Sequence, residues 1–437
     1  MSGTNLENIE GVAVTLLVVG YVLWWLVRRL SRSRAELRIG LPVAVAFCLR
    51  LAAIAGIGIT GLESSLRGGD EQTFLYWAHD LAAQPFGHGW LPHGTYQLHV
   101  VVFGLQLKLG FLTVGALRIT QVGIALTGVV LILAAVYDLA GSRAARLAAW
   151  VIAFEPASIF FNSALHKEPN MELAAGLVVF GGTMLWKRLD VRGILLFVLG
   201  GAIAVPTRSY AGWFLVSAAV FVLLHAGLRN MHRPMRALPA VYGFAIVVFL
   251  ATPAVLAASS SKNLQQLQQS QDANSNGTGT GTTGPNSDNL RLEQVNFSTR
   301  GKILVNLPTR LRDTVLKPYP WQLADASQRF GAIGTVVAYA IFLLLLIYGW
   351  QSRGQIFGRA GPVLYPMLFL LVAYALAAGN AGTGFRYRTH LITLAIAAVA
   401  ILREQALVVR AERKARVQRS VPEQDAGQPP EPVATPA

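Results

Sequence analysis

The chain has 437 residues, of which 53% are hydrophobic and only 14% are charged, and its formal net charge is +15. Soluble globular domains carry about 25% charged residues, so this composition indicates an integral membrane protein. Lys and Arg stand in short clusters between apolar runs, as the positive-inside rule produces. A nucleic-acid binder would instead gather them on one folded face, so no nucleic-acid partner is expected. The single Cys48 excludes a disulfide framework and a cysteine-rich metal site.

The first apolar run is expected to remain in the mature protein. A secretory signal opens with positive residues, whereas residues 1–10 carry Glu7 and Glu10 and no positive charge. The positive residues follow the run and fall within 28–38. This order places the N-terminus outside and residues 28–38 inside.

The chain is predicted to be an all-α, polytopic transmembrane helix bundle of about 11 helices. A transmembrane helix needs about 20 predominantly apolar residues. The stretch 97–112 is also apolar, but it is short and contains Lys108, which favours a helix at the outer surface. The expected spans are 10–27, 42–61, 116–138, 146–162, 171–186, 193–206, 211–227, 238–257, 331–350, 361–378 and 390–403.

Basic residues distinguish the two sides of this bundle. The expected inside segments hold 21 Lys and Arg, whereas the short outside segments hold five. The long segment 258–330 holds eight more, but long loops cross the membrane largely regardless of charge. We therefore expect the N-terminus outside and the C-terminus inside.

Two regions are not expected to be packed spans. Residues 258–289 are rich in Ser, Asn, Gln, Gly and Thr, a composition that cannot bury enough apolar surface to fold alone. After them, Leu304, Leu307, Leu311 and Val315 recur at helical spacing among basic residues, which predicts an amphipathic helix on the outer leaflet. The tail 404–437 is basic and then rich in Pro, Glu and Ala, and is predicted to be disordered.

The unusual polar residues gather on the outer side of this topology. Charged groups at membrane depth are costly and usually face a bundle interior or a water-filled cavity. Their convergence from five segments therefore predicts a cavity that opens outward. These residues are Asp70, Glu71, Asp80, His88, His93, Lys167, Glu168, Arg208, Tyr210, Arg386, Tyr387 and Arg388.

The adjacent acids Asp70 and Glu71 have two interpretations. After Gly68-Gly69, they could cap a helix, because acids favour its positive N-terminal end. They could also act chemically, one as a general base and the other toward a metal or a structural partner. Neighbouring residues on a helix point about 100° apart, so the two carboxylates should have different partners.

Arg386-Tyr387-Arg388 follows a Gly-rich stretch near the last span. Arg and Tyr are common interfacial anchors, yet two arginines on the outer side run against the positive-inside bias. Because the guanidinium fork matches phosphate oxygens, these arginines are candidate phosphate ligands.

The remaining candidates are less specific. Lys167 and Arg208 could bind the same anion or extend toward the membrane surface. His88 and His93 lie in a Gly/Pro-rich stretch and could contact a sugar or a metal, although they lack a metal-binding spacing. Arg50 is expected to reach the surface or to pair structurally, outside the site.

These features resemble the GT-C superfamily of integral-membrane glycosyltransferases, and within it the protein mannosyltransferase and aminoarabinose transferase group. The resemblance covers roughly 45–400. It rests on the acidic pair followed by Phe74, Tyr76 and 77–82, on 156–168, on Pro318-Tyr319-Pro320-Trp321, and on 384–388. The chain departs from the group by an extra first helix, by its Gln/Gly/Thr-rich loop, and by the lack of the large C-terminal domain of some relatives.

The resemblance implies an inverting transfer of a sugar from a polyprenyl-phosphate-linked donor to an acceptor hydroxyl of a protein, a lipid or a glycan. It implies an active site on the non-cytoplasmic face of a membrane, which in bacteria is the inner membrane, and it implies contacts with membrane lipids. Asp70 would be the base, Glu71 could hold Mg²⁺ or Mn²⁺, and the donor phosphate would be bound by Arg386, Arg388, Lys167 and Arg208. Substrate contacts would come from His88, His93, Glu168, Tyr210, Trp321 and Tyr387.

The domain division follows from the same resemblance. Residues 1–40 form the extra helix and a basic inner loop, 41–403 the catalytic bundle, and 404–437 the cytoplasmic tail. Within the bundle, 62–115 is the first outer loop with the acidic motif and 258–330 is the long outer loop.

Three other function classes remain open at this point. One is a non-catalytic membrane scaffold, which applies if the acidic pair only caps a helix. A polysaccharide polymerase or ligase would use a diphosphate-linked donor and an arginine-led outer loop. A transporter or flippase would show matching halves and broken helices near mid-membrane, whereas these polar residues gather at one face.

Overall fold

A computed structural model describes residues 3–60, 63–230, 299–317, 326–353, 356–378 and 381–420, with a few isolated positions between 265 and 321. Apart from one bridge between His93 and Tyr96, every regular element in these ranges is a helix. The predicted span 238–257, the loop 258–289 and the tail beyond 420 lie outside the described residues.

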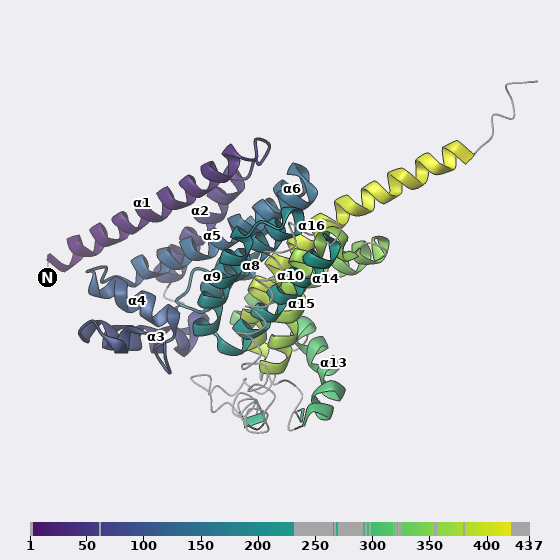
Figure 1. Ribbon diagram of the computed structural model, residues 1–437. Coiled ribbons are helices and arrows are strands. Elements are labelled where there is room, and N and C mark those ends of the chain that lie inside the picture. Colours follow the sequence, from purple (N-terminus) through teal and green to yellow (C-terminus); the bar gives the residue numbers. More distant parts are fainter. Residues whose placement is uncertain are drawn as a thin grey trace, which may run out of the picture.

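The helices are drawn in Figure 1. In chain order they are α1 (Gly3–Arg32), α2 (Gly40–Thr60), α3 (Glu63–Ala83), the 3₁₀ helix η1 (His88–Trp90), α4 (Leu98–Lys108), α5 (Val114–Ala140), α6 (Ser142–Ala153), α7 (Pro156–Phe161), α8 (Glu168–Arg188), α9 (Arg192–Thr207), α10 (Ser209–Arg229), α13 (Arg300–Leu316), α14 (Ala326–Gln351), α15 (Ile356–Ala377) and α16 (Ala381–Ser420).

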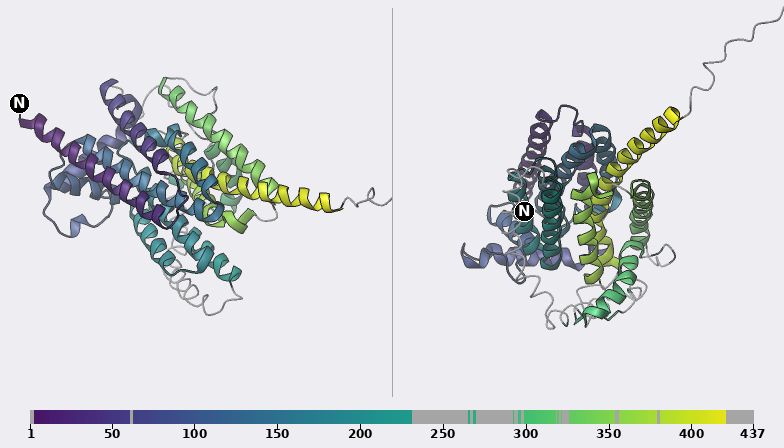
Figure 2. Two further views of the ribbon diagram at one scale, coloured as in Figure 1. Left: turned by 90° about the horizontal axis from the view of Figure 1, so that it is seen from above. Right: turned by 45° about the vertical axis from the view of Figure 1, so that its right-hand side comes forward.

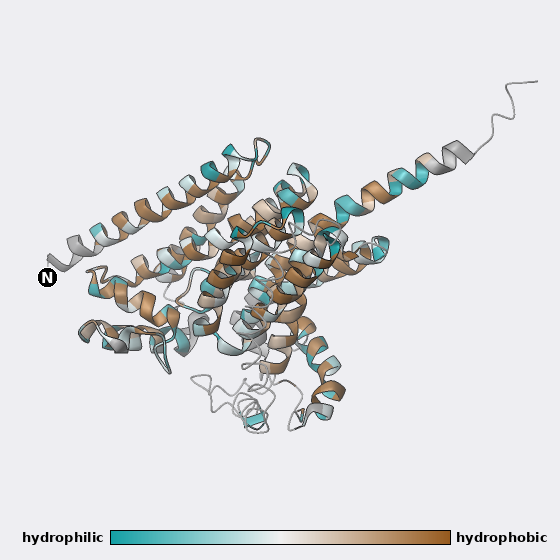
Figure 3. Cartoon of the chain, in the orientation of Figure 1, coloured by the Kyte–Doolittle hydropathy of each residue, from teal (hydrophilic) through white to brown (hydrophobic). Residues whose placement is uncertain are grey.

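Seven helices in the described part of the chain are long and apolar enough to cross a membrane. Their apolar side chains colour most of the bundle brown in Figure 3, with hydrophilic residues toward the helix ends. The predicted all-α, multi-pass membrane fold is thereby confirmed. The seven segments are Ile9–Arg32, Gly40–Ile59, Val114–Ala140, Ser209–Arg229, Ile333–Gln351, Ile356–Ala377 and Arg386–Ala415.

Three further predicted spans take a different form in the structure. The segment 146–162 is divided between α6 and the short α7, because the chain turns at Phe154 and Glu155. The segment 171–186 lies within α8, whose first turns are polar and buried, and 193–206 lies within the shorter α9.

The centre of the bundle depends on close contacts between helix backbones. A Cβ atom placed on Gly128 of α5 would lie 2.6 Å from the carbonyl carbon of Glu172 on α8, and one on Gly176 would lie 2.7 Å from the Gly128 Cα. Gly181 of α8 and Gly193 of α9 approach each other in the same way. Small residues at such crossings are how membrane helices gain packing energy.

Two further helices test what the sequence predicts for the C-terminal half of the chain. The predicted disordered tail is wrong for its basic part, because α16 continues without a break to Ser420 and extends beyond the bundle in both views of Figure 2. Helix formers such as Ala, Arg, Glu and Gln dominate this stretch, so the last span simply continues as a helix. The predicted amphipathic helix is α13, with Leu304 and Val305 exposed and Arg310 and Asp313 buried.

Candidate functional site

The acidic motif of α3 meets the second turn of α16. Asp70 Oδ2 accepts a hydrogen bond from the Arg386 guanidinium, and the two form an ion pair. Their side chains are 24% and 26% exposed, so the pair lies at the edge of the bundle rather than in its interior. A ligand can therefore reach both charged groups.

Glu71 points away from Asp70 and into the protein. Its Oε1 accepts hydrogen bonds from Arg118 Nε of α5 at 2.8 Å and from the backbone N–H of Leu165 at 3.2 Å. The expectation that the adjacent acids have different partners is thus met. The helix-cap interpretation is wrong, because α3 begins at Glu63 and both acids lie well inside it.

A metal does not suit the surroundings of Glu71. Its carboxylate is buried and receives two N–H donors, one of them cationic, whereas Mg²⁺ and Mn²⁺ need further oxygen ligands. The described residues also contain no cluster of three or more His, Cys, Asp or Glu side chains. Metal binding by Glu71 remains a prediction, and these contacts do not favour it.

A second ion pair lies at the N-terminus of α8. Arg208, between α9 and α10, donates to Glu168 Oε1 at 3.0 Å, and its guanidinium lies 4.5 Å from the ring centroid of Tyr387. Burial alone would disfavour the Glu168 carboxylate, but Arg208 outweighs it and holds the pKa of Glu168 well below its usual range. Glu168 therefore remains charged and orients Arg208.

Lys167 supplies a further cation, close enough to Glu168 and Asp70 for their charges to act on it. Its Nζ lies 5.3 Å from the Phe74 ring centroid and forms no ion pair within the described ranges. Burial, followed by the nearby Arg208, lowers the pKa of Lys167 to about 8. An anion that bound here would restore the balance of charge.

Three tyrosines complete this cluster. The rings of Tyr374 and Tyr387 stack at 4.6 Å, and Tyr210 meets both edge-on at 6.4 and 6.5 Å. Arg208 lies beside this aromatic group, so Tyr210 and Tyr387 are next to the charged residues as predicted.

Arg388 lies apart from Arg386. Its guanidinium donates to the carbonyl oxygens of Val315 at 3.1 Å and Lys317 at 2.7 Å, and so fastens the end of α13 to α16. Side chains two positions apart on a helix point about 200° apart around its axis. Arg386 and Arg388 therefore face opposite sides of α16. Arg388 thus has structural partners in α13, and its role as a phosphate ligand stays a prediction.

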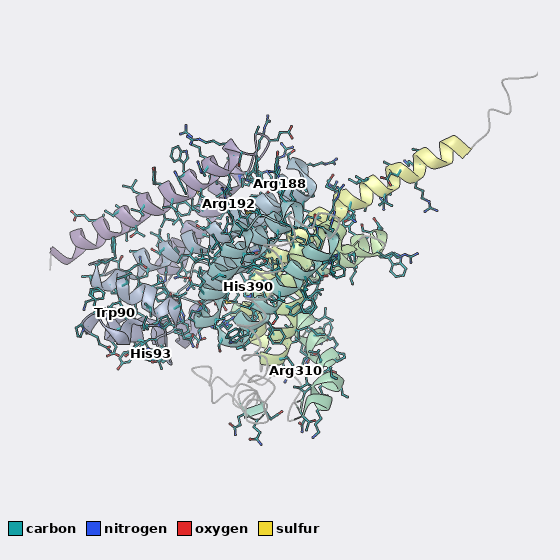
Figure 4. The ribbon with its side chains drawn as sticks, in the orientation of Figure 1. Trp90, His93, Arg188, Arg192, Arg310 and His390 are labelled. Atoms are coloured by element: carbon teal, nitrogen blue, oxygen red, sulfur yellow. The ribbon has the colours of Figure 1, made fainter. Side chains whose placement is uncertain are left out.

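His93 and Trp321, both predicted to bind substrate, are not brought into the cluster. The exposed His93 donates a hydrogen bond from Nδ1 to Leu91 O at 2.6 Å, and it lies with Trp90 at the edge of the molecule, well apart from His390 in Figure 4. His88 begins η1, and the placement of its side chain is outside the described part. Trp321 is 79% exposed and stacks on Tyr319, which suits a contact with lipid.

Two residues of the cluster were missed from the sequence. Arg118, the partner of Glu71, lies near the outer end of a predicted span, and an ionisable residue there is itself a functional signal. His99 of α4 is fully buried with its ring 4.4 Å from Phe74, and no spacing rule singles it out. Arg50, left out of the site, is fully buried and donates to Ser158 Oγ at 2.6 Å, a structural contact.

The chain is thus an integral, multi-pass membrane protein with a partly exposed cluster of ion pairs between α3, α8 and α16. No family model matches it, and no curated protein matches it. Among solved structures it is similar to the archaeal oligosaccharyltransferase AglB from Archaeoglobus fulgidus, solved in complex with an inhibitory peptide and a dolichol-phosphate. The TM-score is 0.41 at 13% identity, and the match covers 91% of this chain but 53% of the other, about half its length. At this score the likeness carries no argument for function.

Proposed function

We propose that this protein is a membrane glycosyltransferase that moves a sugar from a polyprenyl-phosphate-linked donor to an acceptor hydroxyl on the non-cytoplasmic side. The observation that carries the proposal is the partly exposed Asp70–Arg386 pair beside Lys167, which forms no ion pair in the described part of the chain. It combines a carboxylate base with positive charge for a phosphate in one accessible place.

Binding of the donor would rearrange this pair. A phosphate competes with the Asp70 carboxylate for Arg386, because both are anions that suit the same guanidinium fork. Lys167 adds charge from the α8 side, and Arg208 is held nearby by Glu168. Donor binding would therefore draw Arg386 away from Asp70 and make the carboxylate a better proton acceptor.

The chemical step then needs only groups of this cluster. Asp70 takes the proton of the acceptor hydroxyl, whose oxygen forms a bond to the anomeric carbon. The bond from that carbon to the phosphate oxygen breaks, and its electron pair leaves with the phosphate. Arg386 and Lys167 stabilise the departing charge, and attack from the face opposite the phosphate inverts the anomeric centre.

The test is transfer from a labelled polyprenyl-phosphate sugar by the purified protein in lipid nanodiscs. Asp70→Asn should lower the rate by roughly 10²- to 10⁴-fold, the usual contribution of a general base. Asp138→Asn is the matched control, since Asp138 is also an ion-paired aspartate but contacts Arg34 at the other end of α5. Near-normal transfer by Asp70→Asn would remove Asp70 as the base.

The choice of carrier separates this proposal from a polymerase or ligase. A monophosphate-linked sugar should bind in competition with plain polyprenyl phosphate, and Arg386→Ala should weaken both. Turnover with diphosphate-linked donors alone would favour the alternative class.

A further inference from the structure

Four buried polar side chains near the ion pairs have no hydrogen-bond partner for one or more of their polar atoms in the described structure. Both ring nitrogens of His99 and both amide atoms of Gln121 are unpaired, as are Nδ1 of His166 and Nδ2 of Asn170. All four side chains are at least 97% buried. Buried polar groups are nearly always hydrogen-bonded, so these side chains have hydrogen-bonding capacity that a polar ligand would use.

The two histidines lie close to the charged cluster. Burial lowers the pKa of His166 to about 4, with Arg386 as the next cause, and burial followed by Lys167 lowers the pKa of His99 well below its usual value. Both rings are therefore neutral at pH 7. A neutral imidazole offers one donor and one acceptor.

Gln121 and Asn170 lie level with them. Glu71 ties Arg118 to Leu165, and Gly128 meets Glu172 and Leu173, so α5 and α8 run in parallel at a fixed register. Since both helices rise about 1.5 Å per residue, Gln121 lies at the height of the first turn of α8, which carries Asn170. Both amides thus lie at about the level of the charged residues at the start of α8.

The charges around this set favour a neutral ligand over a cationic one. Asp70, Glu71 and Glu168 each have an arginine partner, and no ion pair of Lys167 is found within the described ranges. Glu172, one turn beyond Glu168 on α8, is fully buried, and burial raises the pKa of its carboxyl to about 8, so it is mostly protonated at pH 7. An ammonium group would therefore meet the charge of Lys167 and, in the described part of the chain, no ionised carboxylate of this cluster that lacks an arginine partner.

We propose that His99, Gln121, His166 and Asn170 form a subsite for the hydroxyl groups of an uncharged sugar, on the inner side of the phosphate-binding cations. Sugar hydroxyls both donate and accept hydrogen bonds, which is the capacity that neutral imidazoles and amides provide. This subsite rests on the proposed function and adds to it the class of sugar: a neutral pyranose or furanose rather than an amino sugar.

The test measures binding of three lipids to the protein in nanodiscs: polyprenyl phosphate, a polyprenyl-phosphate hexose, and the corresponding amino sugar. We expect the hexose to tighten binding over polyprenyl phosphate, and the amino sugar to give no such gain. Gln121→Met should weaken binding of the polyprenyl-phosphate hexose by roughly five- to tenfold and leave binding of polyprenyl phosphate unchanged.

A stability measurement distinguishes this role from a structural one. Gln121→Met keeps the side-chain length and removes an unpaired buried amide, so the ligand-free protein should melt at a higher temperature. The matched control is Thr183→Val on α8, whose hydroxyl bonds Val179 O in its own helix, and which should leave hexose binding unchanged. A lower melting temperature for Gln121→Met would show that the amide has a structural partner, which overturns the subsite.

The outcomes for the two proposals are separable. If binding of polyprenyl phosphate does not depend on Arg386, the proposed function fails. If binding of polyprenyl phosphate does depend on Arg386, three results would still overturn the neutral-sugar subsite alone. The hexose would not tighten binding, or it would tighten binding equally in Gln121→Met, or the amino sugar would tighten binding more.

Discussion

Asp70 and Arg386 are 316 positions apart in the chain, yet they form an ion pair at the exposed edge of the bundle. The pair joins α3, which lies outside the set of long apolar spans, to the start of the last span. Each member is only partly buried, so the pair is accessible enough to be exchanged for a pair with a ligand. Several expected outcomes depend on that exchange.

Asp70→Asn should tighten donor binding while it slows transfer. In the natural protein the carboxylate competes with the donor phosphate for Arg386, and the amide removes that competitor. The Kd for polyprenyl phosphate, measured by titration in nanodiscs, should therefore fall. An unchanged or higher Kd would show that the pair does not open when the donor binds.

Donor binding should weaken as the pH rises through about 8. Lys167, whose pKa is lowered to about 8, is charged below that pH and neutral above it, whereas a phosphodiester keeps one negative charge throughout. Loss of a charged hydrogen bond corresponds to roughly ten- to a hundredfold in affinity. Titrations between pH 6.5 and 9.5 measure the effect. Lys167→Arg is the control, since its guanidinium stays charged and should bind equally at both ends of that range.

Breaking the Glu71–Arg118 pair should destabilise the protein more than removing it whole. The pair is buried at 2.8 Å, and loss of one partner from such a pair costs about 3–5 kcal/mol. Glu71→Gln and Arg118→Met should each lower the free energy of unfolding by about that amount. The double variant should recover part of the loss. A double variant whose loss equals the sum of the single losses would mean that the two side chains do not interact.

Gly128→Ala should loosen the contact between α5 and α8. Its Cβ would lie 2.7 Å from the Leu173 Cα, a backbone atom that cannot move without its helix, and overpacking of this kind costs about 1–3 kcal/mol or more. Gly20→Ala in α1 is the matched control, because a Cβ there meets nothing within 4 Å and should be neutral or slightly stabilising. Thermal unfolding of the two variants in one detergent compares them directly.

Hydropathy and periodicity predicted those parts of the structure that depend on local sequence. The long apolar helices, the amphipathic helix that is α13, and the divergent partners of Asp70 and Glu71 all follow from residue spacing along one helix. These features need no knowledge of which helices are neighbours, so one sequence is enough to find them.

The contacts between helices depend on how the helices pack, which residue spacing along one helix does not predict. The last span is predicted to begin at 390, which leaves Arg386 and Arg388 ahead of it. In the structure α16 begins at Ala381, and helix geometry directs the two arginines to opposite sides. The pairing of Glu71 with Arg118 depends on how α3 packs on α5, and apolarity alone does not define that contact. His99 falls in the stretch predicted to be a surface helix, whereas in the structure its side chain is fully buried.

The glycine crossing of α5 and α8 also limits how the protein can open. These helices carry Arg118 and Glu168, and with backbones in contact at Gly128 and Gly176 they cannot slide past each other. They form the fixed wall of the site. Any rearrangement of the Asp70–Arg386 pair is therefore expected to move α3 relative to α16 and to leave α5 and α8 in place.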